Sequence, residues 1–106
     1  MSPESMRAID IKNGTGPASA LFINENTPRP IPRPGECLIK VHAFGINRAD
    51  TAQREGKYPG ISHLTKTLGL EFSGIIAFIA EDETRETRDS KWKIDDEVFG
   101  LVYGGG

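Results

Sequence analysis

The chain has 106 residues, enough for one domain and not for two. Its 13 basic and 15 acidic residues are well mixed and give a net charge of −2, so no basic face for nucleic acid is indicated. No apolar run approaches the roughly 20 residues that span a bilayer, and the N-terminal segment lacks the apolar stretch of a secretory signal. The single cysteine, Cys37, excludes an internal disulfide and fits a reducing compartment. We therefore expect a cytoplasmic domain that binds neither nucleic acid nor membrane.

The first part of the chain predicts two short strands followed by a connector. Residues 6–12 have a strand-like pattern that stops at the turn-forming residues 13–17, and residues 19–24 predict the second strand. The segment 27–35 has four prolines in seven positions. Because proline lacks an N–H and fixes φ, we expect an extended connector there and neither a central strand nor a helix.

Residues 36–43 have the clearest strand pattern. Apolar and polar side chains alternate, with one face formed by Cys37, Ile39, Val41 and Ala43 and the other by Glu36, Lys40 and His42. Residues 68–80 form the longest apolar stretch, and their β-branched and aromatic side chains favour a strand. Gly74 predicts a bulge or a close backbone contact within it. A last strand is predicted at 97–103, after a turn at 94–96.

A short helix is predicted at residues 47–56. Asn47 is a favourable N-cap residue, and Asp50 lies three positions on, where a carboxylate suits the positive helix N-terminus. Gly56 is placed to end the helix. One short helix with five or six short strands predicts a mainly-β barrel or sandwich. The sequence has no glycine-rich phosphate loop between a strand and a helix.

Five residues are candidates for chemistry, and each has a plain structural alternative. Asn47 faces a cofactor or only caps its helix. Glu71 lies in an apolar strand, so its carboxylate pairs with a partner, faces water or serves a site. Tyr58 stacks on a ligand or anchors its loop. The histidines, His42 and His63, match no zinc-ligand spacing and are expected to face solvent.

Three stretches together resemble the N-terminal catalytic domain of the medium-chain dehydrogenase/reductase family, above all its zinc-free quinone oxidoreductase (zeta-crystallin-like) branch. They are VHAFGINRADTAQREGKYP (41–59), LGLEFSGII (68–76) and WKIDDEVFGLVYGGG (92–106). The resemblance covers residues 6–106 and leaves residues 1–5 as an N-terminal extension. It implies a GroES-like twisted β-barrel with one or two short helices, in agreement with the strand pattern.

The resemblance also implies a function and a site. The function is that of an NADPH-dependent oxidoreductase acting on a small quinone or enone, in which the cofactor carries the hydride and the protein polarises the acceptor oxygen. Asn47 and Tyr58 are implied to be catalytic and cofactor-binding, with Asp50 close behind them. Zinc is not expected, because the metal-binding members have Cys at the position of Asn47 and His at that of Leu70. An amide binds zinc poorly and leucine cannot bind it.

The sequence departs from the family in two ways. Asp95 replaces the glycine of the pattern K-x-G-D-x-V, at a turn expected to need a positive φ, which Asp tolerates better than most residues. Family members also carry a Rossmann domain that holds the NADPH pyrophosphate and a C-terminal return that completes the first domain. We therefore expect a truncated, incomplete barrel that is inactive alone and does not bind NADPH tightly.

Three further interpretations stay open. Exposed apolar edges are expected to favour a homodimer or pairing with a full-length homologue. A non-enzymatic β-domain that binds or regulates a partner would also fit a chain without a cofactor domain. A fragment of an enoyl thioester reductase would use the same hydride chemistry.

Overall fold

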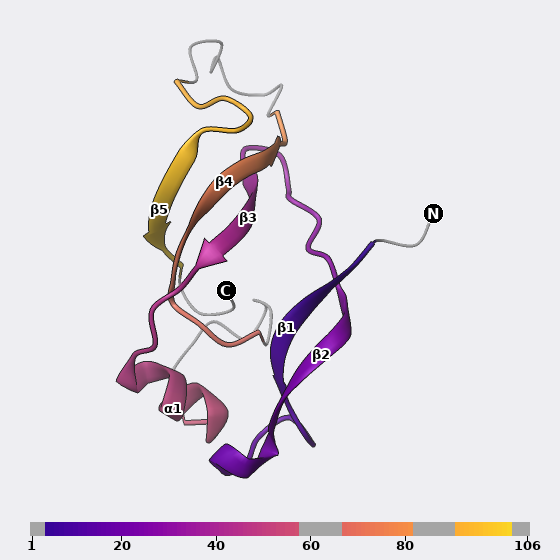
Figure 1. Ribbon diagram of the computed structural model, residues 1–106, viewed down its shortest axis with the longest axis vertical. Coiled ribbons are helices and arrows are strands. Elements are labelled where there is room, and N and C mark those ends of the chain that lie inside the picture. The colour runs from indigo at the N-terminus through magenta and orange to yellow at the C-terminus, as the bar shows by residue number, and fades with distance from the viewer. Residues whose placement is uncertain (1–3, 58–66, 82–90, 103–106) are drawn as a thin grey trace.

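The computed structural model describes residues 4–57, 67–81 and 91–102. Within them the chain forms five strands, one α-helix and one short 3-10 helix (Figure 1). The elements in chain order are β1 (Ser5–Ile11), η1 (Ala18–Ala20), β2 (Leu21–Pro28), β3 (Cys37–Ala43), α1 (Arg48–Arg54), β4 (Glu71–Ile79) and β5 (Glu97–Leu101). The mainly-β prediction is confirmed. Neither helix in these ranges has the length and apolar character needed to cross a membrane.

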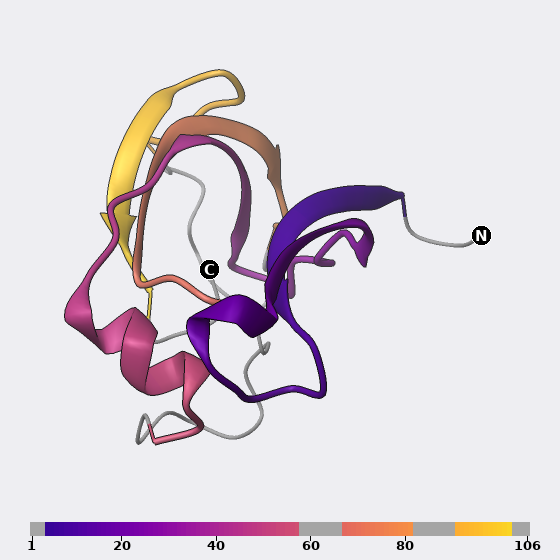
Figure 2. The ribbon, with the colours of Figure 1, turned by 60° about the horizontal axis from the view of Figure 1, so that its bottom comes forward.

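The strands form two antiparallel sheets. β1 pairs with β2, and β4 lies between β3 and β5 in a three-stranded sheet. The two sheets lie side by side, with α1 below the three-stranded sheet, and in the described part of the chain they do not close into a barrel (Figures 1 and 2). The strands of the described residues therefore form two open sheets.

β2 differs from the prediction at both ends. Ala18–Ala20 form η1 and not the start of a strand, and β2 continues to Pro28, into the segment expected to be a connector. Within the described residues β2 pairs with β1 alone, so Pro28 ends an edge strand, where proline is tolerated. Its partner in the register is Ser5, which is already part of β1.

β3 confirms the strand predicted at 36–43 but not the simple alternation of its faces. The register with β4 shifts at two places, between Leu38 and Ile39 and between Val41 and Ala43. Such shifts turn the following side chains to a new direction. Cys37 and Val41, placed on the apolar face by the pattern, are both exposed. His42 is exposed as predicted.

Gly74 and Ile76 of β4 form the centre of the three-stranded sheet. Ile76 is 2% exposed, and Gly74 is buried as well. A Cβ at Gly74 would overlap the carbonyl oxygen of Lys40 and stand 2.9 Å from its carbon and 3.0 Å from the Cα of Val41. The predicted close backbone contact is confirmed, and only glycine lets β3 and β4 approach this closely.

The turn before β5 is fixed on β4 by backbone bonds. The N–H of Asp95 donates to the carbonyl of Ile76 at 2.8 Å, and the N–H of Ile76 donates to the carbonyl of Asp96 at 3.0 Å. The Asp96 carboxylate accepts from the N–H of Lys93 at 2.9 Å. Asp95 has the positive φ that was predicted, 73°. These bonds hold the turn in a conformation for which the family normally uses glycine.

Gly74→Ala is expected to lower the free energy of unfolding by about 3 kcal/mol, because the methyl group meets backbone that cannot move aside. Gly100→Ala on β5 is the matched control, since its Cβ would first meet the Phe72 ring, at 3.2 Å, and a ring can turn. Urea unfolding followed by circular dichroism measures both variants. Equal stability of the two would contradict the close approach at Gly74.

Asp10 joins β1 to β2 through its carboxylate. It accepts from Asn24 Nδ2 at 2.9 Å and from the N–H of Ile11 at 2.7 Å, and these bonds, that from Asn24 foremost, lower the pKa of Asp10. Because the pKa is lower in the folded than in the unfolded chain, ionised Asp10 stabilises the fold above about pH 4. That stabilisation is lost as the pH falls through the folded pKa.

Asn24→Ala is therefore expected to raise the pKa of Asp10 toward its ordinary value and to weaken the dependence of stability on pH below about pH 4. NMR titration of the Asp10 carboxyl carbon measures the pKa directly. Glu25→Gln, at an exposed position on the same strand, is the control and leaves the pKa of Asp10 unchanged. An unchanged pKa in Asn24→Ala would contradict the role of the bond between the strands.

Candidate functional site

The structure brings together three of the residues singled out from the sequence: Asn47, Asp50 and Glu71. Asn47 and Asp50 lie at the start of α1, and Glu71 is the first residue of β4. Asn47 Nδ2 donates to Glu71 Oε2 at 3.1 Å, across 24 positions of sequence. Glu71 thus has a side-chain amide as its partner, which is one of the alternatives left open for its carboxylate. Tyr58 and His63 lie outside the described residues.

Asn47 and Asp50 form a capping box at the N-terminus of α1. The N–H of Asn47 donates to Asp50 Oδ2 at 2.9 Å, and the Asn47 side chain lies against the N–H of Asp50. Asn47 has an extended backbone, with φ −126° and ψ 160°, as an N-cap residue should. At the other end Gly56 has a φ of 77°. The predicted cap and helix end are both confirmed.

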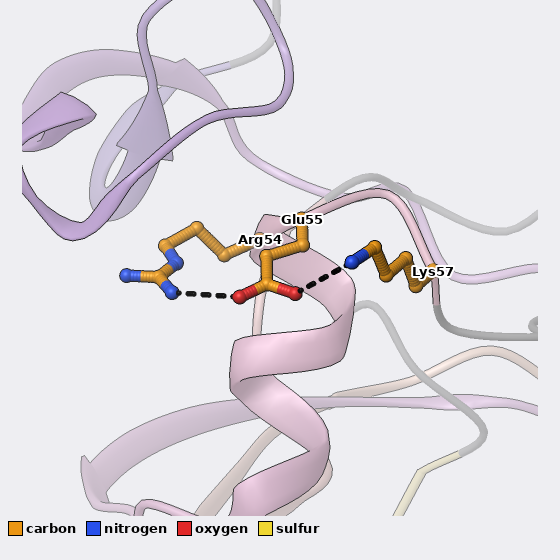
Figure 3. A network of polar contacts seen from close by, with 3 residues as sticks. All are labelled: Arg54, Glu55 and Lys57. Atoms are coloured by element: carbon orange, nitrogen blue, oxygen red, sulfur yellow. Dashed lines mark hydrogen bonds and ion pairs between the residues drawn. The ribbon is translucent and has the colours of Figure 1, made fainter.

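α1 is fixed to the rest of the domain by one bond from its backbone and one from a side chain. The Arg54 carbonyl accepts from the N–H of Gly16 at 3.0 Å, and Gln53 Oε1 accepts from the N–H of Gly69 at 3.1 Å. Glu55 pairs with Arg54 at 3.3 Å and with Lys57 at 3.5 Å (Figure 3). Ion pairs at a surface contribute little to stability. The bonds to Gly16 and Gly69 therefore set the position of the helix, and with it the position of Asn47.

An apolar cleft of about 440 Å³ lies beside this group. Three short segments line it: the residues before α1, the start of β4 and the end of β5, namely Ala43, Phe44, Gly45, Glu71, Phe72, Ser73, Phe99, Gly100 and Leu101. Glu71 is the only charged residue of this lining. Asn47 and Asp50 are not part of it. Glu71 is thus the residue that links the cleft to the helix cap.

The cleft contains residues that sequence reasoning did not single out. Phe99 and Leu101 are 86% and 81% exposed, although both are large and apolar. Their spacing of two on a predicted strand already placed them on one face. That pattern was the available signal for an apolar surface at the end of β5.

No three His, Cys, Asp or Glu side chains are grouped to hold a metal ion in the ranges 4–57, 67–81 and 91–102. Leu70, at the position where metal-binding members of the family have a histidine, directly precedes Glu71. Its carbonyl accepts from the N–H of Val102 at 2.8 Å, which extends the pairing beyond β5. At this position the chain offers a backbone contact between strands and no side-chain donor.

The alcohol dehydrogenase GroES-like domain model matches residues 33–104. A quinone oxidoreductase of Lama guanicoe is 37% identical over 102 residues, which are 94% of this chain and 29% of the relative. A trans-enoyl reductase of Talaromyces variabilis is 32% identical over 88 residues, which are 77% of this chain and 22% of the relative. A mycobacterial protein solved in complex with NADPH is 30% identical with a TM-score of 0.70, over 94% of this chain and 29% of the other.

The fold and these comparisons define a GroES-like domain. The chain belongs to the alcohol dehydrogenase GroES-like domain family, and the resemblance to quinone oxidoreductases of the medium-chain dehydrogenase/reductase family is confirmed. It spans less than a third of the length of each of these relatives.

The chemistry of the cleft suits one end of NADPH and not the other. Phe44, Phe72 and Phe99 offer aromatic walls, and Asn47, which is bonded to Glu71 of the lining, offers an amide. Such a surface can accept a flat ring with a polar edge. None of the lining residues is basic, so this part of the chain provides no charge for the phosphates. The residues present fit the nicotinamide, and the pyrophosphate requires groups from elsewhere.

Asp50→Ala is expected to lower the free energy of unfolding by about 1 kcal/mol, because it removes the acceptor for the N–H of Asn47 and a charge favourable to the helix N-terminus. Asp50→Asn keeps an acceptor and is expected to cost less. Thr51→Ala, at an exposed position on the same helix, is the control. Thermal and urea unfolding measure all three, and a loss no larger than that of Thr51→Ala would contradict the capping role.

Proposed function

We propose that this chain is the catalytic-domain portion of an NADPH-dependent quinone or enone oxidoreductase that works without zinc. The observation that supports this function best is the apolar cleft, in which Glu71 is the one charged lining residue and is bonded to Asn47. A flat conjugated acceptor suits a surface with several aromatic side chains. NADPH, when bound, supplies the hydride.

Asn47, which is bonded to Glu71 of the cleft lining, is the residue to which we assign hydrogen bonding to the acceptor. Its amide carries two donor hydrogens and one acceptor oxygen. Glu71 takes one of the hydrogens, which leaves the second to donate to an acceptor oxygen as charge develops there. Asp50 acts through the backbone of Asn47 and does not touch the cleft. Tyr58 keeps the role implied by the family resemblance as a prediction.

The donor set at this position argues for chemistry without zinc. Asn47 offers an amide, and Leu70 offers no ligand atom in its side chain. Activity of the whole protein also needs a site for the NADPH pyrophosphate, and the cleft has no basic residue for it. We therefore include two expectations in the proposal: the chain alone does not turn over NADPH, and zinc is not required.

The test joins this chain to the nucleotide-binding domain of a quinone oxidoreductase and measures NADPH oxidation with a small quinone. We expect turnover in the joined protein, none in the chain alone, and no loss after treatment with a chelator. Asn47→Ser keeps a capping oxygen but loses the amide, so kcat is expected to fall by about tenfold to hundredfold. Thr51→Ala is expected to leave kcat unchanged.

A folded joined protein without turnover would contradict the proposed function. Loss of turnover on chelation would contradict only its zinc-free part.

The relative named as a trans-enoyl reductase favours a second candidate, the reduction of enoyl thioesters. Hydride would be delivered to the β-carbon of the enoyl group, and the α-carbon would then take a proton. The same joined protein, assayed with a short enoyl thioester beside the quinone, separates the two candidates. A higher kcat/KM for the thioester would favour the second.

A further inference from the structure

Glu71 reaches Asn47 because Gly45, which lies next to the Glu71 carboxylate, has no side chain. A Cβ at Gly45 would overlap Glu71 Oε1 and stand 2.7 Å from Glu71 Cδ. One carboxylate oxygen therefore occupies the space that any other residue at position 45 would fill. The other oxygen, Oε2, accepts from Asn47 Nδ2 at 3.1 Å. Gly45 thus leaves the space that the Glu71 carboxylate occupies.

This bond determines the direction of the Asn47 amide. A carboxylate only accepts hydrogen bonds, whereas one end of an amide donates and the other accepts. Glu71 therefore selects the orientation in which Nδ2 points to β4. The capping box holds the backbone of Asn47 and places its side-chain oxygen against the N–H of Asp50, and Glu71 is the partner of the Nδ2 end of this exposed side chain. A single hydrogen bond biases such an orientation by about tenfold.

We propose that Glu71 is a positioning residue for Asn47 and that Gly45 is needed for Glu71 to act. The three residues connect the lining of the cleft, to which Gly45 and Glu71 belong, with Asn47 at the N-terminus of α1. The effect of this positioning on catalysis rests on the function proposed above. The orientation of the Asn47 amide is independent of that function. The two can therefore be measured separately.

The orientation is tested by NMR on the full chain labelled with ¹⁵N, from the exchange of the Asn47 Nδ2 hydrogens with water. Glu71→Leu keeps a side chain of similar size without an acceptor, so exchange is expected to become about tenfold faster. Glu71→Gln keeps a carbonyl oxygen as acceptor and is expected to retain most of the protection. Glu97→Leu, at an exposed position on β5, is the matched control and changes nothing.

Gly45→Ala provides a second, independent variant. It leaves the charge of Glu71 in place and adds a methyl group against the far end of a flexible side chain, so the fold is expected to survive. The displaced carboxylate should then release Asn47, with the same acceleration of exchange as in Glu71→Leu. Unchanged Asn47 exchange in either variant, with the backbone signals of α1 and β4 in place, would overturn the proposal.

The catalytic consequence is tested in the joined protein. Glu71→Leu and Gly45→Ala are expected to lower kcat by about tenfold with little change in the KM for NADPH, because they misplace the Asn47 amide and leave the aromatic side chains of the cleft in place. Glu71→Gln is expected to restore most of kcat, and a fall in stability alone would not be rescued in this way.

If Asn47→Ser leaves kcat unchanged, the catalytic role assigned to Asn47 in the proposed function is wrong. The exchange of the Asn47 Nδ2 hydrogens then still shows whether Glu71 positions the amide. If Asn47→Ser lowers kcat and the exchange data show no effect of Glu71, the positioning fails and the function stands.

Discussion

The contact between Gly74 and the backbone of β3 is the constraint on which the site depends. It allows β4 to lie close to β3 on one side while pairing with β5 on the other. Glu71 lies three positions earlier on the same strand and pairs in the register with Leu101. Gly74, at the centre of the sheet, therefore also helps to place the Glu71 carboxylate between the N-terminus of α1 and the end of β5.

The site is built where a helix cap meets a strand, and Asn47 belongs to both. As an N-cap residue it has a fixed extended backbone, because Asp50 holds its N–H. Its side chain is then directed by Glu71, from a strand that follows much later in the sequence. A cap is a rigid point of the backbone, and a rigid point is a good place for a group that has to meet a substrate. The capping role and the proposed catalytic role of Asn47 thus support each other.

The parts of the fold governed by local chemistry were predictable from the sequence. α1 followed from Asn47 and Gly56, and the need for glycine at position 74 followed from its place in an apolar strand. The extent of β2 was not predictable, because proline is excluded only from the interior of a sheet and the sequence does not say which strand is at an edge. The bond between Asn47 and Glu71 was out of reach for a similar reason. It depends on how α1 and β4 are placed in three dimensions, and the spacing of the two residues carries no periodic signal.

The balance of buried and exposed side chains explains why the cleft is open. Ile11 and Ile76 are the buried large apolar side chains of the described residues, whereas Phe99 and Leu101 at the cleft remain largely in water. Covering a side chain of this size contributes about 1.5–3 kcal/mol, so whatever fills the cleft gains from it. The proposed hydride transfer would also benefit when water is excluded, since the hydrogen bonds of Asn47 are stronger in an apolar surrounding. The exposure of the cleft in this chain is thus a second physical reason, beside the lack of basic residues for the phosphates, to expect catalysis only when further protein surface closes over it.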